Sequence, residues 1–243
     1  MKMRIKEKLM MDMQGLIDNG PITIVAFGDS VTHGAFSSGE IDYEAVYHHL
    51  LAKKISKVRE YVPVNVINAG IGGISAKGSL GRLESQALKH DPDLMIVAFG
   101  LNDVNGSLES YLSSLKTIFA ACLERNIETV FLTPNMLNTY VADDTAESLR
   151  GYAAKTADMQ TNGRMDEYIF AAKELALSMG VKVADCYSKW REMAKTTDTT
   201  VLLDNRINHP CREMHQLFAD TIFDVILGDD TESRENDSTM YKG

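Results

Sequence analysis

The sequence predicts an α/β fold built on a mostly parallel sheet of about five strands. Three observations indicate it. Short apolar runs of strand length alternate with segments of ten or more residues that have helical character. The first three of these runs each end in a polar loop that contains glycine. No internal repeat or linker divides the chain, so we expect right-handed βαβ units in one sheet.

The expected strands are continuous apolar runs, which are typical of strands buried in a parallel sheet. They cover residues 22–27, 63–68, 94–99, 128–133 and 181–184. The expected helices have apolar residues at intervals of three and four. They cover residues 3–17, 43–60, 76–90, 108–125, 164–179, 185–194 and 211–227.

We expect a single domain over residues 1–228, with a helical extension at residues 1–20. Residues 134–163 form an insertion next to the end of the fourth strand. Its stretch 136–163 is polar and has few periodic signals, and its place after a strand end favours a lid or a substrate wall over a remote surface excursion. Residues 229–243 are acidic and polar with almost no apolar content, and we expect a disordered tail.

The composition excludes several classes of function. The net charge is −9, from 34 acidic and 25 basic residues, and no basic stripe indicates a nucleic-acid partner. No apolar run approaches the roughly 18 residues that span a membrane. The N-terminal lysines lack the apolar core of a signal peptide, and three scattered cysteines suit a reducing compartment. We therefore expect a cytoplasmic protein; its oligomeric state stays open.

The loops that follow the first three strands carry the candidate chemistry. In a parallel sheet these loops share one edge, where ligands bind. Ser30 follows the first strand and can be a nucleophile, or it can cap a helix. His209, stiffened by Pro210, is the best placed base. The backbone N–H groups of Ser30 and Gly73 and the side-chain amide of Asn102 can form an oxyanion hole.

Four blocks of this chain resemble those of the SGNH (GDSL) hydrolase superfamily, in order and in spacing. They are Gly28-Asp29-Ser30, Asn68 through Gly73, Gly100-Leu101-Asn102-Asp103 and Asn208-His209-Pro210. The resemblance implies a three-layer α/β/α fold of the flavodoxin-like type. It also implies a carboxylic ester hydrolase that acts on a small-molecule ester and needs no metal or other cofactor.

The same resemblance implies roles for individual residues. Ser30 is the nucleophile, His209 is the base, and Ser30, Gly73 and Asn102 are the oxyanion donors. Gly73 aligns best with the glycine donor of the family, while Gly70 and Gly72 stay open as alternatives.

The chain departs from the family at one position. The aspartate that orients the histidine ring usually stands three positions before it, where this chain has Arg206. The nearest acid is Asp204, five positions before His209. Asp204 can orient the ring if the intervening segment loops out; otherwise a backbone carbonyl or Asn208 holds the ring, and Ser30 and His209 act as a dyad.

We therefore expect a serine esterase that removes small acyl groups, such as acetyl, from a carbohydrate or a similar polar alcohol. A lysophospholipase or thioesterase for longer acyl chains is the alternative within the same fold. A ligand-binding protein that has lost turnover is the alternative outside the enzymes, because Arg206 stands in the place of the acid.

Overall fold

The sheet of the protein has five parallel strands in the order β2-β1-β3-β4-β5. It is seen in a computed structural model that describes residues 2–37 and 39–228. The expected tail, residues 229–243, lies outside the described residues. The strands are β1 (Ile22–Gly28), β2 (Val64–Gly70), β3 (Leu94–Ala98), β4 (Glu128–Leu132) and β5 (Lys182–Ala184).

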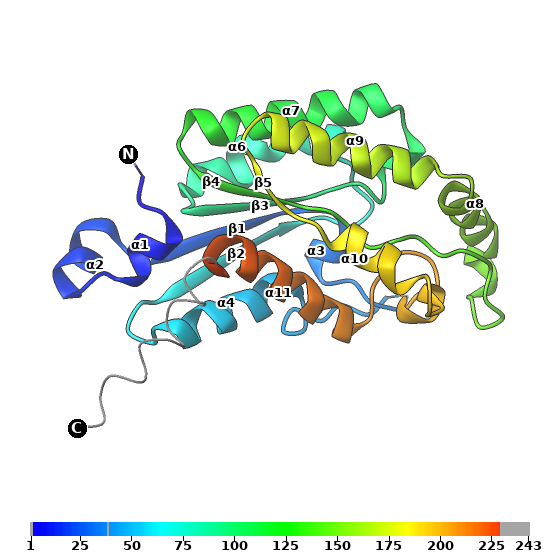
Figure 1. Ribbon diagram of the computed structural model, residues 1–243, viewed down its shortest axis with the longest axis horizontal. Coiled ribbons are helices and arrows are strands. Elements are labelled where there is room, and N and C mark those ends of the chain that lie inside the picture. The colour runs from blue at the N-terminus through cyan, green and yellow to red at the C-terminus, as the bar shows by residue number, and fades with distance from the viewer. Residues whose placement is uncertain (1, 38, 229–243) are drawn as a thin grey trace.

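Helices cover both faces of this sheet, which confirms the expected three-layer α/β/α fold. Helices α6, α7 and α9 lie on one face and α4 and α11 on the other, while α8 lies at the end of the molecule opposite α1 and α2 (Figure 1). The helices are α1 (Ile5–Leu9), α2 (Met13–Asn19), α3 (Ser30–His33), α4 (Tyr47–Val58), α5 (Ala76–Ser79), α6 (Leu83–Gln86), α7 (Leu108–Glu124), α8 (Arg150–Thr161), α9 (Arg164–Ser178), α10 (Cys186–Met193) and α11 (Arg212–Leu227). Short 3₁₀ turns are η1 (Leu80–Arg82), η2 (Leu88–His90), η3 (Asp103–Asn105), η4 (Glu147–Leu149) and η5 (Thr199–Leu202). None of the helices in these described segments is long and apolar enough to cross a membrane.

Two of the expected helices are broken into shorter pieces. The segment 3–17 forms α1 and α2, because the Asp12 side chain accepts a hydrogen bond from the Gly15 N–H at 2.9 Å and starts a new helix. The segment 76–90 forms α5, α6 and two 3₁₀ turns, and it contains Gly78 and Gly81, which weaken a continuous helix.

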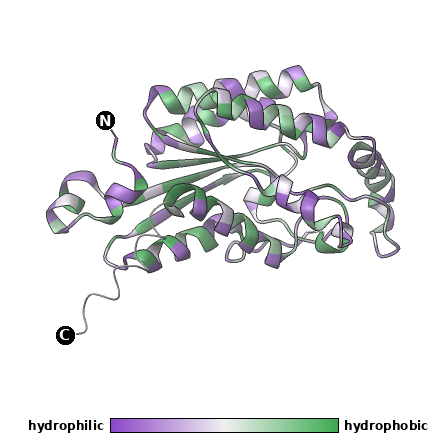
Figure 2. Cartoon of the chain, viewed as in Figure 1, coloured by the Kyte–Doolittle hydropathy of each residue, from purple (hydrophilic) through white to green (hydrophobic). Residues whose placement is uncertain are grey.

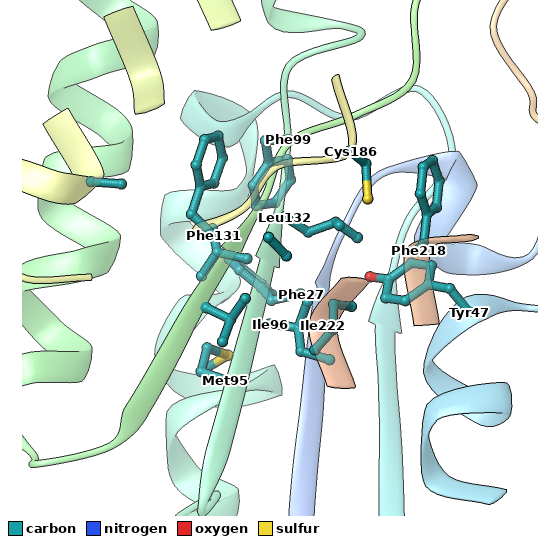
Figure 3. Close-up of a cluster of buried hydrophobic side chains, with 14 of the residues drawn as sticks. Phe27, Tyr47, Met95, Ile96, Phe99, Phe131, Leu132, Cys186, Phe218 and Ile222 are labelled. Carbon is teal, nitrogen blue, oxygen red and sulfur yellow. The ribbon is translucent and has the colours of Figure 1, made fainter. Parts of the chain in front are cut away.

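The core lies between the sheet and its two helical layers. Figure 2 shows the apolar character of the strands, and Figure 3 shows part of the packing. The rings of Phe27 and Phe99 meet edge to face at 5.4 Å between centroids. On the other face of the sheet the rings of Tyr47 in α4 and Phe218 in α11 also meet edge to face, with 6.1 Å between their centroids. Such pairs add to the stabilisation from burial and fix both helical layers against the sheet.

The strand register brings three loops to one edge. Gly28 at the end of β1 pairs with Gly70 of β2 and with Ala98 of β3, so all three strands end at the same level. Helix α3 sits directly on these ends. A Cβ atom at Gly70 would lie 2.3 Å from the His33 nitrogen, and one at Gly28 would lie 2.1 Å from Thr32 Oγ1. Glycine at both positions allows this close approach.

Candidate active site

Ser30 is the first residue of α3, immediately beyond β1. The helix begins there because the Asp29 carboxylate accepts a hydrogen bond from the Val31 N–H at 3.0 Å. His209 reaches it from the loop before α11. The distance from His209 Nε2 to Ser30 Oγ is 3.0 Å, which is hydrogen-bond distance. The structure thus brings together two residues that lie 179 positions apart in the chain.

The other ring nitrogen of His209 faces the backbone. Its Nδ1 lies 2.8 Å from the carbonyl oxygen of Phe36. A carbonyl oxygen can only accept, so Nδ1 carries a proton and donates it to Phe36. In the neutral ring Nε2 is then an acceptor, and the hydroxyl of Ser30 donates to it. This is the protonation state that a general base needs.

The structure does not place Asp204 against the ring, in contrast to the expectation that its carboxylate orients His209. The Asp204 N–H donates to the His209 carbonyl at 2.8 Å, while its carboxylate lies 3.7 Å from Arg212 Nη1. The segment between them does turn back, because Asn205 holds it in a tight turn, but this turn brings the two backbones together and leaves the carboxylate beside Arg212. The side-chain oxygen of Asn205 accepts from three successive backbone N–H groups, the last being that of His209 at 2.9 Å.

Arg206, which stands where the family usually has its acid, points elsewhere. Its backbone is left-handed, with φ of 58°. Its guanidinium pairs with Asp144 at 2.9 Å and donates to the Val201 carbonyl at 2.8 Å. The side chain therefore ties the loop before His209 to the segment before α8.

The expected oxyanion donors lie on the loops beside Ser30. Asn102 follows β3, and its side-chain amide donates to the Ile74 carbonyl at 3.1 Å, which fixes the amide next to the loop after β2. Gly73 in that loop has φ of 74°, a conformation that favours glycine. A Cβ atom on the neighbouring Gly72 would be 4.0 Å from Ser30 Cβ, so this loop runs in contact with the serine.

A cavity of about 490 Å³ joins these groups. The expected site residues other than Asp204 line it, and so do residues of the segment η4–α8. These lining residues include Ser30, Gly73, Asn102, His209, Leu149 and Tyr152.

The stretch 136–163 contains α8, although its sequence has no helical periodicity. Hydrogen bonds hold the parts of this stretch together. The Asn138 side chain donates to the Ala153 carbonyl at 2.9 Å and accepts from Thr156 Oγ1 at 2.6 Å. The Leu137 N–H donates to the Gln160 side chain at 2.9 Å. Because α8 buries small and polar side chains, it shows no apolar stripe. It is a packed wall of the cavity.

Buried titrating groups surround the nucleophile. Burial, with a smaller contribution from the charge of Asp103, raises the pKa of Asp29 to about 7. Burial likewise raises the pKa of Asp103 to about 6, although one of its oxygens accepts from the Ala76 N–H at 2.9 Å. Burial lowers the pKa of His209, and the hydrogen bond to Phe36 opposes this only in part. His209 is therefore neutral at pH 7, as a base must be.

Arg82 lies behind the nucleophile loop. This buried guanidinium donates to the Ala69 carbonyl at 2.6 Å and to the Gly28 carbonyl at 3.1 Å, and it stacks over the Phe27 ring at 4.3 Å. It joins the ends of β1 and β2 and so holds the backbone that precedes Ser30. Among the described residues, no group of three or more histidine, cysteine or acidic side chains is arranged to hold a metal ion.

Comparison with known protein families assigns the chain to one of them. The family model of GDSL-like lipases and acylhydrolases matches residues 26–217, a span that includes both Ser30 and His209. The chain belongs to this family. It is therefore a carboxylic ester hydrolase by family.

Solved structures with the same fold include three esterases or hydrolases. An acetylxylan esterase from Geobacillus stearothermophilus is 19% identical, with a TM-score of 0.65 over 85% of this chain and 94% of that one. A lipase/acylhydrolase from Enterococcus faecalis is 24% identical, with a TM-score of 0.65 over 86% and 96%. An alpha/beta hydrolase from the metagenome of Lake Arreo, Spain, is 19% identical, with a TM-score of 0.64 over 84% and 94%. No curated protein matches the chain.

The contact of His209 with the Phe36 carbonyl is the feature of this GDSL-type hydrolase that the residue pattern did not specify. A backbone carbonyl has no sequence signature, because every residue carries one. One indirect sign in the sequence indicates that no acid orients the ring, namely Arg206 at the position of the usual acid.

Proposed function

We propose that the protein is a serine esterase for small acyl groups, with Ser30 and His209 acting as a dyad. One observation carries the proposal: His209 lies 3.0 Å from Ser30 Oγ through Nε2 and 2.8 Å from the Phe36 carbonyl through Nδ1. The carbonyl selects the tautomer and the ring orientation that a carboxylate selects in a triad.

Acylation begins when Ser30 Oγ attacks the ester carbonyl carbon while its proton passes to His209 Nε2. A tetrahedral intermediate with an oxyanion results. The C–O bond to the alcohol then breaks, and the imidazolium returns its proton to the departing alkoxide oxygen. Water, deprotonated by the same nitrogen, attacks the acyl-serine, and the acid leaves as Ser30 recovers its proton.

The oxyanion is held by N–H groups that line the same cavity. Ser30 is the first residue of α3, and the first N–H groups of a helix have no partner within it. One N–H of the Asn102 side-chain amide donates to the Ile74 carbonyl at 3.1 Å, and the second N–H can donate to the oxyanion. Gly73 adds a backbone N–H. Each such donor is worth about 3 kcal/mol in the transition state.

The imidazolium that forms during each step has no carboxylate beside it. A neutral carbonyl stabilises this charge less than a carboxylate does. We expect a lower rate than that of a complete triad, with the loss lying in kcat because the charge exists only in the transition state and intermediates.

The cavity supports a small acyl group on a polar alcohol. At about 490 Å³ it lies in the lower half of the range of small-molecule sites, and Ser37, Asn205 and Asn208 give it polar walls. The Geobacillus stearothermophilus structure is of an acetylxylan esterase, and its catalytic mutants carry alanine in place of one serine or one histidine. We therefore propose an acetylated carbohydrate as the substrate class.

A longer acyl chain is the second candidate, because Ile41, Leu149 and Ile207 give the cavity an apolar section. A series of p-nitrophenyl esters from two to twelve carbons separates the two. A maximum at two to four carbons supports the small-acyl esterase, and a maximum at eight or more supports a lysophospholipase or thioesterase.

The test of the mechanism is acetate release from p-nitrophenyl acetate by the wild type and by Ser30→Ala. We expect the variant to lose at least about 10³-fold in kcat. Equal rates would remove Ser30 from the mechanism. Acetate release from acetylated xylooligosaccharides then tests the substrate class.

A further inference from the structure

The carbonyl that orients His209 belongs to a short hairpin loop, here called the orienting loop, which comprises residues 34–37 and 39–42. The two sides of the loop are joined by the bridge between Ala35 and Ile41. The Phe36 N–H donates to the Glu40 carbonyl at 3.1 Å, and the Asp42 N–H donates to the Gly34 carbonyl at 2.9 Å. These contacts tie the two sides of the loop together, so the position of Phe36 O depends on the position of the whole loop.

One side chain from outside this loop holds it at three points. The Arg212 guanidinium donates to the Glu40 carboxylate and, through Nε, to Asp42 Oδ2 at 3.1 Å. Its central carbon lies 4.5 Å from the centroid of the Phe36 ring. Arg212 thus contacts both sides of the orienting loop and the residue that supplies the carbonyl.

Arg212 also belongs to the segment that carries the base. It is the first residue of α11, three positions after His209. This segment is fixed to the chain before it, because Leu203 bridges to Pro210 and the Cys211 N–H donates to the Leu202 carbonyl at 2.9 Å. The guanidinium therefore links the orienting loop to the segment that carries the histidine.

We propose that Arg212 is a positioning residue for His209, acting through the orienting loop and the Phe36 carbonyl. This inference rests on the proposed dyad. In a triad the group that orients the histidine is a charged side chain, which can adjust its position to that of the imidazole ring. In this chain it is a neutral backbone atom, so its placement depends on what fixes the loop.

Loss of the Arg212 guanidinium should change the catalytic rate more than the stability of the fold. Each exposed ion pair contributes little to folding, and the Arg212 side chain, which pairs with Glu40, Asp42 and Asp204, is about two fifths exposed. The reaction rate is sensitive to small displacements, because a shift of about 1 Å in a catalytic group can lower the rate about 10²-fold.

The experiment compares Arg212→Met with Arg125→Met in the full chain. Methionine keeps an apolar stem against the Phe36 ring and removes the guanidinium. Arg125 is a matched control, since its side chain is equally exposed and also pairs with a carboxylate, Glu84 at 2.7 Å, on the far side of the sheet. We expect Arg212→Met to lower kcat for p-nitrophenyl acetate about 10-fold, with KM within about 2-fold, and Arg125→Met to change neither.

The proton NMR signal of the His209 Nδ1–H reports orientation directly. It is assigned by its absence in His209→Gln. We expect it to broaden or disappear in Arg212→Met and to persist in Arg125→Met, while the melting temperatures of both variants stay close to that of the wild type.

Two further variants keep the test decisive if Arg212→Met does not fold. Arg212→Lys keeps the charge and should lose about 3-fold in kcat. Asp42→Asn should lose a similar factor, because Asn can still cap the next turn through the oxygen that accepts from the Glu44 N–H at 3.0 Å. Unchanged kcat and an unchanged Nδ1–H signal in these variants would overturn the role of Arg212. Activity that survives Ser30→Ala would instead overturn the dyad itself.

Discussion

The substitution Asp204→Asn distinguishes a dyad from a triad. If the Asp204 carboxylate oriented His209, its loss would cost about 10⁴-fold in kcat, as the loss of the orienting carboxylate does in serine proteases. In this protein the carboxylate lies 3.7 Å from Arg212 and makes no hydrogen bond to the ring, whose Nδ1 is bonded to Phe36. A long, partly exposed ion pair of this kind contributes at most about 1 kcal/mol, or about 5-fold in a rate.

We therefore expect kcat for p-nitrophenyl acetate to fall by less than about 5-fold in Asp204→Asn. The backbone N–H of residue 204, which donates to the His209 carbonyl, is retained in this variant. The assay includes His209→Gln, which removes the base and should lose at least about 10³-fold. A loss of 10²-fold or more in Asp204→Asn, with an unchanged melting temperature, would refute the dyad.

Three more predictions follow from the site and its surroundings. Asn102→Ala should lower kcat about 10²- to 10³-fold with little change in KM, since the donor acts on a charge present only in the transition state; an equal rise in KM would instead indicate ground-state binding. The acid limb of kcat/KM should lie below pH 6.5, because burial lowers the pKa of His209 and activity is lost only as falling pH protonates it. That limb should persist in Asp29→Asn; a limb above pH 6.5 would contradict the assignment. Burial lowers the pKa of His215 to about 3, so its neutral form stabilises the native state above pH 6.5 and this contribution is lost as pH falls toward 3. The free energy of unfolding, measured with urea, should therefore fall about 1.4 kcal/mol per pH unit more steeply in the wild type than in His215→Gln over this interval.

The parts of the site that follow strand ends could be predicted from the sequence. Apolar runs that end in glycine specify buried parallel strands, and parallel strands place their following loops on one edge. Ser30, Gly73 and Asn102 could be brought together on this basis, and they line one cavity. His209 is the best placed base because it lies on the loop before the last helix, and its block also resembles a family block.

The remaining features depend on interactions that residue patterns do not record. Helix α8 buries Ala153 and Thr156 instead of an apolar stripe, so its segment had no helical period. Asp204 is the nearest acid in sequence, but its carboxylate lies beside Arg212, because distance along the chain does not record which way a side chain points. The Phe36 carbonyl reaches the ring because an entire loop is placed there by tertiary contacts.

The central claim is that His209 activates Ser30 for attack on an acyl carbon. The most direct measurement is the rate at which a fluorophosphonate labels the protein, with the modified residue located by mass spectrometry of its peptides. We predict a single adduct on Ser30, formed at least about 10²-fold more slowly in His209→Gln. An adduct on another serine, or equal labelling rates in the two proteins, would contradict the account.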